Sequence, residues 1–151
     1  MIRSNGTLLL VEDNEDDLFF MQRAIKAAEI SNALQVVRDG QAAIDYLAGE
    51  GEYADRNRFP TPCLTLLDLK LPRRSGFEVL SWLRRQSELQ ALVVIVLSTS
   101  KERRDIENAY GLGANAYLVK PNDVTRLTEM LKAIKCFWLA FNEFAVPASL
   151  R

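Results

Sequence analysis

The sequence predicts an α/β fold, a doubly wound five-stranded parallel sheet with helices on both faces. Short apolar runs alternate five times with segments of helical periodicity, which is the pattern of repeated strand–helix units. The runs around Leu64 and Val93 contain almost no polar residue, as is typical of strands covered on both faces. Short connections between the units favour right-handed crossovers. No internal repeat competes with this interpretation.

The first two units follow each other closely. Thr7–Val11 is a compact apolar run, and Glu15–Ala28 carries apolar residues at helical spacing. Leu34–Val37 predicts a short second strand. Asp39 then suits the N-cap of a helix that Gly49 would end.

An irregular, polar stretch, Gly49–Pro62, separates the second unit from the third. Leu64–Leu67 is the predicted third strand. Ser75 and Glu78 then have the spacing of a capping box, which predicts that a helix begins there.

The last two units complete the sheet. Val93–Leu97 is strongly β-branched, and a charged helix is expected from about Glu102 to Tyr110. Ala116–Val119 predicts the final strand, and Asp123 precedes a helix with one apolar face.

Composition limits the classes of function. With 151 residues and 48% hydrophobic content, we expect residues 1–151 to form one domain, with a core of about 6–135 and an apolar extension at 136–151. The net charge of −1 gives no support for binding nucleic acid. No signal-peptide pattern or membrane-length apolar run is present, so we expect a cytoplasmic protein without membrane contact. Cys63 and Cys136 are too far apart in sequence to suggest a zinc site or disulfide framework.

The chain contains no histidine. Catalysis by Ser-His-Asp or Cys-His groups is therefore excluded, and so is phosphorylation of a histidine in this chain. Any acid, base or acceptor chemistry must rest on carboxylates, lysine or hydroxyl groups.

Polar residues follow four of the predicted strands, at the sheet edge where open α/β folds bind ligands. Clustered carboxylates raise one another's pKa unless a cation is present, and Mg²⁺ prefers oxygen ligands. With a metal, an ammonium group and a hydroxyl group nearby, the carboxylate after the third strand could act as a nucleophile toward phosphorus. The residues concerned are Glu12, Asp13, Asp68, Ser98, Thr99 and Lys120.

Four motifs in this order carry a family resemblance: Val11-Glu-Asp-Asn, Leu66-Leu-Asp-Leu-Lys-Leu-Pro, Val96-Leu-Ser-Thr-Ser and Ala116-Tyr-Leu-Val-Lys-Pro. Together they resemble the receiver domain of two-component response regulators over roughly residues 6 to 135. The resemblance implies a flavodoxin-like strand order of 2-1-3-4-5. It also implies a stand-alone signalling protein that catalyses only its own phosphotransfer and dephosphorylation.

The resemblance further implies a role for each matching residue. Asp68 would accept a phosphoryl group from a sensor histidine kinase. Mg²⁺, or Mn²⁺ in its place, would bind Asp68, Asp13, the backbone carbonyl of Lys70 and, through water, Glu12. The residues expected to hold the phosphoryl group or to switch in response to it are Ser98, Thr99, Lys120 and the aromatic Tyr117.

The C-terminal extension contains more apolar surface than a terminal helix needs, which is typical of an interface. Together with the 49–62 stretch and the Ser-Thr-Ser triplet, it resembles the response regulators paired with bacterial phytochrome histidine kinases. That resemblance implies a homodimer joined through an arm, although the tail could instead fold back on its own sheet. The arm residues would be Phe137, Trp138, Phe141 and Phe144.

Other interpretations weigh less. A magnesium phosphohydrolase would need a second carboxylate soon after Asp68, where Leu69, Lys70 and Leu71 stand instead. A receiver-like interaction module that works without phosphorylation is the main alternative. Asp16 and Asp17 are interpreted as an acidic first turn. The arginine pairs at 73–74, 84–85 and 103–104 are interpreted as solvated faces.

Overall fold

Five parallel strands form one sheet in the order β2-β1-β3-β4-β5 in a computed structural model that describes residues 6–145. The predicted fold class and strand order are thereby confirmed. Residues 146–151 of the predicted extension lie outside the described residues. The strands are β1 (Leu8–Val11), β2 (Leu34–Val37), β3 (Leu64–Leu67), β4 (Val93–Ser98) and β5 (Ala116–Val119).

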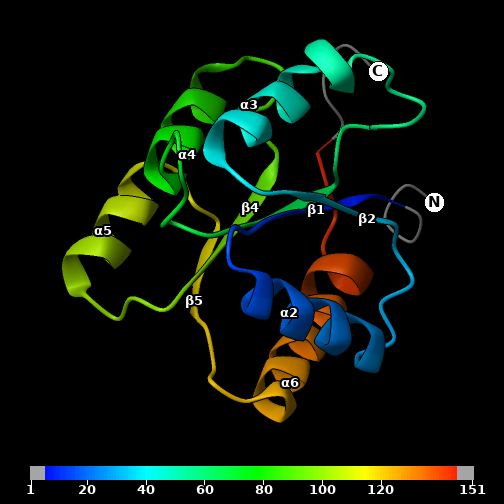
Figure 1. The fold of residues 1–151 in the computed structure, drawn as a ribbon, viewed down its shortest axis with the longest axis vertical. Helices are drawn as coiled ribbons and strands as arrows, with labels where there is room; N and C mark the ends of the chain where they lie inside the picture. Colours follow the sequence, from blue (N-terminus) through cyan, green and yellow to red (C-terminus); the bar gives the residue numbers. More distant parts are fainter. Residues whose placement is uncertain (1–5, 146–151) are drawn as a thin grey trace.

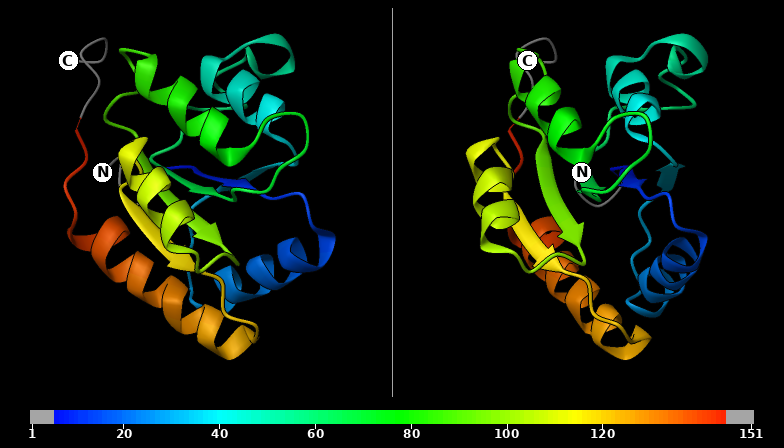
Figure 2. Two further views of the ribbon diagram at one scale, coloured as in Figure 1. Left: turned by 90° about the vertical axis from the view of Figure 1, so that its left-hand side faces the viewer. Right: turned by 60° about the vertical axis from the view of Figure 1, so that its left-hand side comes forward.

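Helices cover both faces of the sheet (Figure 1). Two of them, α2 and α6, pack together on one face, and the other three lie on the opposite face, as both views of Figure 2 show. Four helices begin at a side chain that accepts the backbone N–H three residues later. They include the predicted caps Asp39 and Ser75, and also Asp123, which was expected to precede the last helix. The helices are α2 (Glu15–Ala27), α3 (Gly40–Ala48), α4 (Gly76–Arg85), α5 (Arg103–Gly111) and α6 (Val124–Ile134).

The sheet separates two apolar cores because successive strand side chains point to opposite faces. Leu8 and Leu10 of β1 belong to the core under α2 and α6, whereas Leu9 and Val11 belong to the core under α3, α4 and α5. All four residues of β1 are buried, as are all four of β3. The continuous apolar runs of the sequence therefore correspond to strands that are covered on both faces.

The stretch at 49–62 is better ordered than its polar sequence suggests. It contains a short 3₁₀ helix, η1 (Gly51–Tyr53), and packs Tyr53 and Phe59 around the buried ring of Tyr46, with centroids 5.1 and 6.0 Å from it. Arg56 donates to the backbone carbonyls of Tyr46 and Leu47 at the end of α3. The stretch is thus anchored to α3 by aromatic packing and by one guanidinium group.

Arg84 corrects the prediction that the arginine pairs form solvated faces. Its half-buried guanidinium donates to the carbonyls of Leu92 and Gly113 at 2.8 Å and to the side-chain oxygen of Asn115 at 2.9 Å. Burial lowers the pKa of Arg84 from its ordinary value. This side chain ties the end of α4 to the loop before β4 and to the loop after α5.

Replacing Arg84 with alanine is expected to lower the free energy of unfolding by about 2–3 kcal/mol, because several part-buried carbonyls would lose a charged donor. Urea unfolding followed by circular dichroism measures the change. Arg85→Ala is the matched control, because Arg85 is exposed and donates to the hydroxyl of Ser81 on its own helix. We expect less than about 0.5 kcal/mol for the control. Equal effects of the two variants would contradict the role assigned to Arg84.

The C-terminal extension folds back in part onto the chain's own core. After α6 the chain continues as a π-helical segment, η2 (Lys135–Phe141). Leu139 is buried, and Trp138 and Phe144 pack partly against the core under α2 and α6. Phe137 and Phe141 remain 57% and 76% exposed. Part of the predicted arm thus belongs to the chain's own core, and part of it is free surface.

Candidate functional site

The ammonium group of Lys120 lies at the centre of a cluster of carboxylates at the carboxyl edge of the sheet. Its Nζ donates to Glu12 Oε1 at 2.6 Å, to Asp68 Oδ2 at 3.0 Å and to Asp17 Oδ2 at 3.2 Å. The Lys120 and Glu12 side chains are 9% and 2% exposed, and that of Asp68 is 12% exposed. The residues that follow β1, β3 and β5 therefore meet in a largely buried cluster, and Asp17 of α2 lies at its rim with 40% of its side chain exposed.

Burial and charge act in opposite directions in this cluster. Burial raises the pKa of the Glu12 carboxyl above its ordinary value, and the contact with Lys120 offsets only part of that effect. Burial also works against the charged form of Lys120, but the Glu12 and Asp68 carboxylates outweigh it and raise the pKa of the lysine. The ammonium group therefore stays charged and balances the carboxylates around it.

Backbone pairing explains why Glu12 and Asp68 are neighbours. Val11 lies opposite Leu67 in the parallel register of β1 and β3, so the residue after each strand reaches the same sheet edge. The backbone N–H of Asp68 donates to the carbonyl of Val11 at 3.2 Å. The backbone N–H of Lys120 similarly donates to the backbone carbonyl of Ser98 at 2.8 Å. The positions of the site residues thus follow from the register of the sheet.

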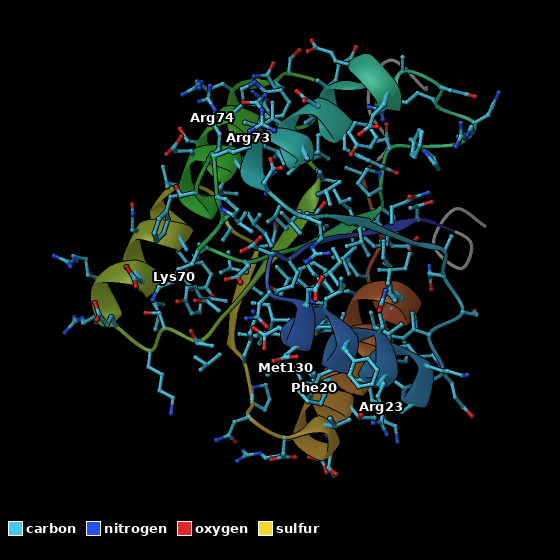
Figure 3. The ribbon with its side chains drawn as sticks, viewed as in Figure 1. Phe20, Arg23, Lys70, Arg73, Arg74 and Met130 are labelled. Atoms are coloured by element: carbon cyan, nitrogen blue, oxygen red, sulfur yellow. The ribbon has the colours of Figure 1, made fainter. Side chains whose placement is uncertain are left out.

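The loop after Asp68 turns sharply back toward α4. The Gly76 N–H donates to the carbonyl of Leu69 at 2.9 Å, and a Cβ at Gly76 would lie 2.2 Å from the carbonyl oxygen of Asp68. Arg73 adopts a left-handed backbone with φ of 67°. Figure 3 labels Lys70 and Arg73 on this loop, where Lys70 is exposed. The loop is therefore packed so closely that only glycine fits where α4 begins.

Two of the predicted phosphate-binding hydroxyls differ in their surroundings. Ser98 ends β4 and is buried, and its Oγ accepts the N–H of Ser100 at 3.1 Å. Thr99 is exposed. Tyr117 of β5 donates its hydroxyl to the carbonyl of Ser100 at 2.9 Å. Ser98 and Tyr117 are thus joined through Ser100.

The site offers the oxygen donors that a hard divalent cation prefers, but its carboxylates are not grouped around one point. Glu12 and Asp68 are carboxylates on adjacent strand ends, which is the donor chemistry that Mg²⁺ prefers. Asp13 is exposed, and no group of three or more Asp, Glu, Cys or His side chains within residues 6–145 is gathered closely enough to hold a metal. In this structure Lys120 supplies the positive charge shared by Glu12 and Asp68.

A cleft of about 300 Å³ opens beside Lys120, between α2 and the loop from β5 to α6. Asp17, Phe20 and Pro121 contribute to its walls. Phe20 and its neighbour Phe19 are 42% and 55% exposed. In Figure 3, Phe20 and Met130 are labelled on the layer formed by α2 and α6. The site is thus flanked by exposed apolar side chains, and an apolar patch of this kind is typical of an interaction surface.

Asp17 lies in the acidic first turn of α2, as predicted, but it was not predicted to lie at the site. Its carboxylate also reaches Lys120 from a position 103 residues away in sequence. Its place on the inward side of α2, four residues before the buried Met21, was the available signal.

Comparison with known proteins is consistent with this geometry. Residues 8–132 match the family described as the response regulator receiver domain. The chain belongs to the response regulator receiver family. The helices of the receiver within residues 6–145 include none long and apolar enough to cross a bilayer.

Three relatives illustrate the similarity of this receiver to proteins of known structure. Response regulator Rcp1 of Synechocystis sp. is 39% identical over 132 residues, which is 87% of this chain and 88% of Rcp1. Response regulator RPA3017 of R. palustris, from red light signalling, has a TM-score of 0.89 and 37% identity, with 93% of this chain and 99% of that chain covered. The phosphorylated cyanobacterial phytochrome response regulator RcpA has a TM-score of 0.85 and 37% identity, with 93% and 98% covered.

Proposed function

We propose that Asp68 accepts a phosphoryl group from the phosphohistidine of a sensor histidine kinase. The observation that carries this proposal is the ion pair between Asp68 Oδ2 and Lys120 Nζ at the carboxyl edge of the sheet, at 3.0 Å. An Asp68 oxygen would bond to phosphorus while the phosphorus–nitrogen bond of the donor breaks and the imidazole leaves with its electron pair. RcpA, whose structure is that of a phosphorylated protein, supports the assignment by its similarity.

The residues around Asp68 suit this transfer. Lys120 places a fixed positive charge where a phosphoryl group on Asp68 would bring negative charge. Ser98 accepts a hydrogen bond from Ser100, so its own proton is free to donate to a phosphoryl oxygen. Asp68 is the least buried of the three innermost charged groups and can meet a donor. The chain acts by signalling, and its chemistry is limited to its own phosphotransfer and dephosphorylation.

Mg²⁺, or Mn²⁺ in its place, is the proposed metal partner of the reaction. Asp13, Asp68 and the carbonyl of Lys70 would hold it, with Glu12 acting through water. A bound divalent cation would neutralise the carboxylates and the incoming phosphate. The oxygen donors of adjacent strand ends support this choice, and Rcp1, which is similar to this chain, has been solved in an Mn²⁺-bound form.

Replacing Asp68 with asparagine is expected to abolish phosphorylation, because the amide is not a nucleophile toward phosphorus. The protein is incubated with Mg²⁺ and acetyl phosphate and resolved on a phosphate-affinity gel, where the wild type should give a slower band. Asp16→Asn is the matched control, since Asp16 is an exposed acidic residue of α2, and it should keep the slower band. A shifted band that survives in Asp68→Asn would refute the assignment of Asp68, whereas a wild type without a slower band would favour the interaction-module alternative.

The proposed kinase partner is a bacterial phytochrome. The similarity to RPA3017 and RcpA, both described as light-signalling or phytochrome regulators, supports this choice. The same gel, with ATP and a phytochrome kinase in place of acetyl phosphate, provides the test. A response regulator of this kind should be labelled faster by a phytochrome kinase than by an unrelated histidine kinase. Equal rates with both kinases would argue against the partnership.

The C-terminal extension is proposed to join two copies of this receiver. Phe137 and Phe141 are exposed apolar residues one helical turn apart, and they would be covered in a dimer. Phe141→Glu is expected to weaken dimerisation at least about tenfold, because a buried carboxylate would replace an aromatic ring. Light scattering at micromolar concentration measures the mass. Phe19→Glu, which changes a 55% exposed ring on α2, should leave the mass unchanged. A wild-type monomer would contradict the dimer.

A further inference from the structure

The turn between β2 and α3, residues 38–41, contacts both loops that carry the proposed metal ligands. Arg38 Nη2 donates to the backbone carbonyl of Asp13 at 3.0 Å, in the loop that follows β1. The backbone N–H of Gly40 donates to the carbonyl of Pro72 at 3.2 Å, in the loop that follows β3. The turn itself contributes no side chain to the cluster of carboxylates. It therefore lies outside the site and contacts the loops on two sides of it.

Gly40 is the first residue of α3, and it lies against the backbone of the loop after β3. A Cβ at Gly40 would lie 1.9 Å from the carbonyl oxygen of Arg74 and 2.6 Å from the carbonyl carbon. Backbone atoms cannot rotate aside, so any larger residue would push α3 and this loop apart. Gly76, the first residue of α4, approaches the carbonyl oxygen of Asp68 in the same way. The loop 69–75 is thus confined between the first residues of two helices.

Side chains add two further contacts between this loop and α3. Arg74 Nε donates to Gln41 Oε1 at 3.1 Å, and Gln41 Nε2 donates to Asp45 Oδ1 at 3.0 Å, which fixes the orientation of the amide. Arg73 lies 3.6 Å from the carboxylate of Asp39, the residue that caps α3. Figure 3 labels Arg73 and Arg74 where the loop passes these helices. Because exposed ion pairs contribute little, the oriented amide of Gln41 is the stronger of the two contacts.

We infer that Gly40 and Gln41 are positioning residues for the proposed metal site. By holding the loop 69–75, they place the carbonyl of Lys70 relative to Asp13 on the neighbouring loop. Mg²⁺ demands near-ideal octahedral geometry, so a small displacement of one ligand loop weakens its binding. Groups that orient metal ligands without touching the metal typically change its affinity about 10–100-fold when they are replaced. The start of α3 thus contributes to metal affinity without supplying a ligand.

This positioning role rests on the proposed function in one respect, the binding of a divalent cation between the two loops. It does not depend on the transfer of a phosphoryl group to Asp68. Mn²⁺ alone serves as the probe, because the electron paramagnetic resonance signal of free Mn²⁺ falls as the ion binds. A wild type that binds Mn²⁺ but is not labelled by acetyl phosphate would contradict the function of Asp68, and the positioning role would stand.

Gly40→Ala is expected to raise the dissociation constant for Mn²⁺ at least about tenfold, because the displaced loop no longer presents its carbonyl to the ion. A titration of the full chain with Mn²⁺, followed by paramagnetic resonance, measures the constant. Gly111→Ala is the matched control, since a Cβ at Gly111 meets nothing within 4 Å, and it should bind Mn²⁺ as the wild type does. Circular dichroism under the same conditions checks that each variant is folded.

Gln41→Met removes the amide but keeps the length of the side chain, so it tests the second contact without a steric clash. We expect the dissociation constant for Mn²⁺ to rise about threefold, the effect of one lost hydrogen bond. In an Arg74→Met background the same substitution should have no further effect, because the bond is already lost. A merely structural effect of Gln41 would be equal in both backgrounds. Gln35→Met, which changes a glutamine of β2 that donates to the carbonyl of Arg58, should leave the affinity unchanged.

Three results would overturn the positioning role. A folded Gly40→Ala variant with the Mn²⁺ affinity of the wild type would show that the start of α3 does not set the position of the ligand loop. An effect of Gln41→Met that is equal with and without Arg74 would show that the amide does not act through the loop. A wild type that binds no Mn²⁺ would remove the proposed metal and the positioning role together. If Gly40→Ala does not fold, the comparison of Gln41→Met in the two backgrounds decides the question.

Discussion

Lys120→Met is expected to lower the free energy of unfolding by about 3 kcal/mol, the lower end of the cost of breaking a buried ion pair. Methionine keeps the length and packing of the side chain but removes the charge. Glu12, which is almost fully buried, would then lack its cation at 2.6 Å, and Asp68 would lose a partner at 3.0 Å. Asp68 retains some contact with water, which keeps the loss moderate.

Urea unfolding in the absence of divalent cations measures the effect of Lys120→Met. Lys101→Met is the control, because Lys101 is an exposed lysine of the loop between β4 and α5. Its free energy of unfolding should stay within about 0.5 kcal/mol of that of the wild type. Coincident unfolding curves for the two variants would show that Lys120 does not balance the buried carboxylates.

Gly76→Ala is expected to slow phosphorylation at Asp68 at least about tenfold, because a methyl group would displace the backbone on which the acceptor depends. The new Cβ would lie 2.2 Å from the carbonyl oxygen of Asp68 and 2.7 Å from Cα of Leu69. Both are backbone atoms that cannot rotate aside. Such a clash also costs about 1–3 kcal/mol of stability.

The initial rate of labelling by acetyl phosphate measures the effect of Gly76→Ala. Gly111→Ala is the matched control, since a Cβ at Gly111 meets nothing within 4 Å. Gly111 lies at the end of α5, where alanine should leave the rate unchanged and add up to about 1 kcal/mol of stability. Equal labelling rates for Gly76→Ala and the wild type would contradict this prediction, because they would show that the loop can accommodate a methyl group at position 76.

The sheet could be predicted because its strands are defined by local apolar runs. Val93–Leu97 is β-branched throughout apart from its last residue, and the structure extends that strand by Ser98 alone. The strand order was a consequence of the family resemblance, since apolar periodicity does not specify which strands are neighbours. Helix starts were predicted well at Asp39, Ser75 and Asp123, where one side chain caps its own helix.

The centre of the site was predicted for the same reason, because parallel strands place their last residues at one edge. Glu12, Asp68 and Lys120 could be assigned to the site from their positions directly after predicted strands. Asp17 could not be found in this way, since its contact depends on how α2 packs against the loop after β5. Asp13 was expected beside the other two carboxylates as a metal ligand, and this role remains a prediction.

Contacts between a side chain and distant backbone were the least predictable. The partners of Arg84 are mainly carbonyl oxygens of other segments, which every residue carries and no sequence pattern marks. The surroundings of the C-terminal extension were also hard to predict. Apolar content predicts that Trp138 and Phe137 will be covered, but it does not say whether the chain's own core or another molecule covers them.

The hydroxyl of Tyr110 has a consequence for how copies of this protein can associate. β5 is an edge strand, and an open edge invites another chain to add a strand through its unpaired backbone groups. The outward N–H of Tyr117 in this strand is already taken by the Tyr110 phenol. A strand arriving at this edge would have to displace a helix side chain first. Growth into an extended sheet is thereby disfavoured at β5, and association is directed to surfaces made of side chains.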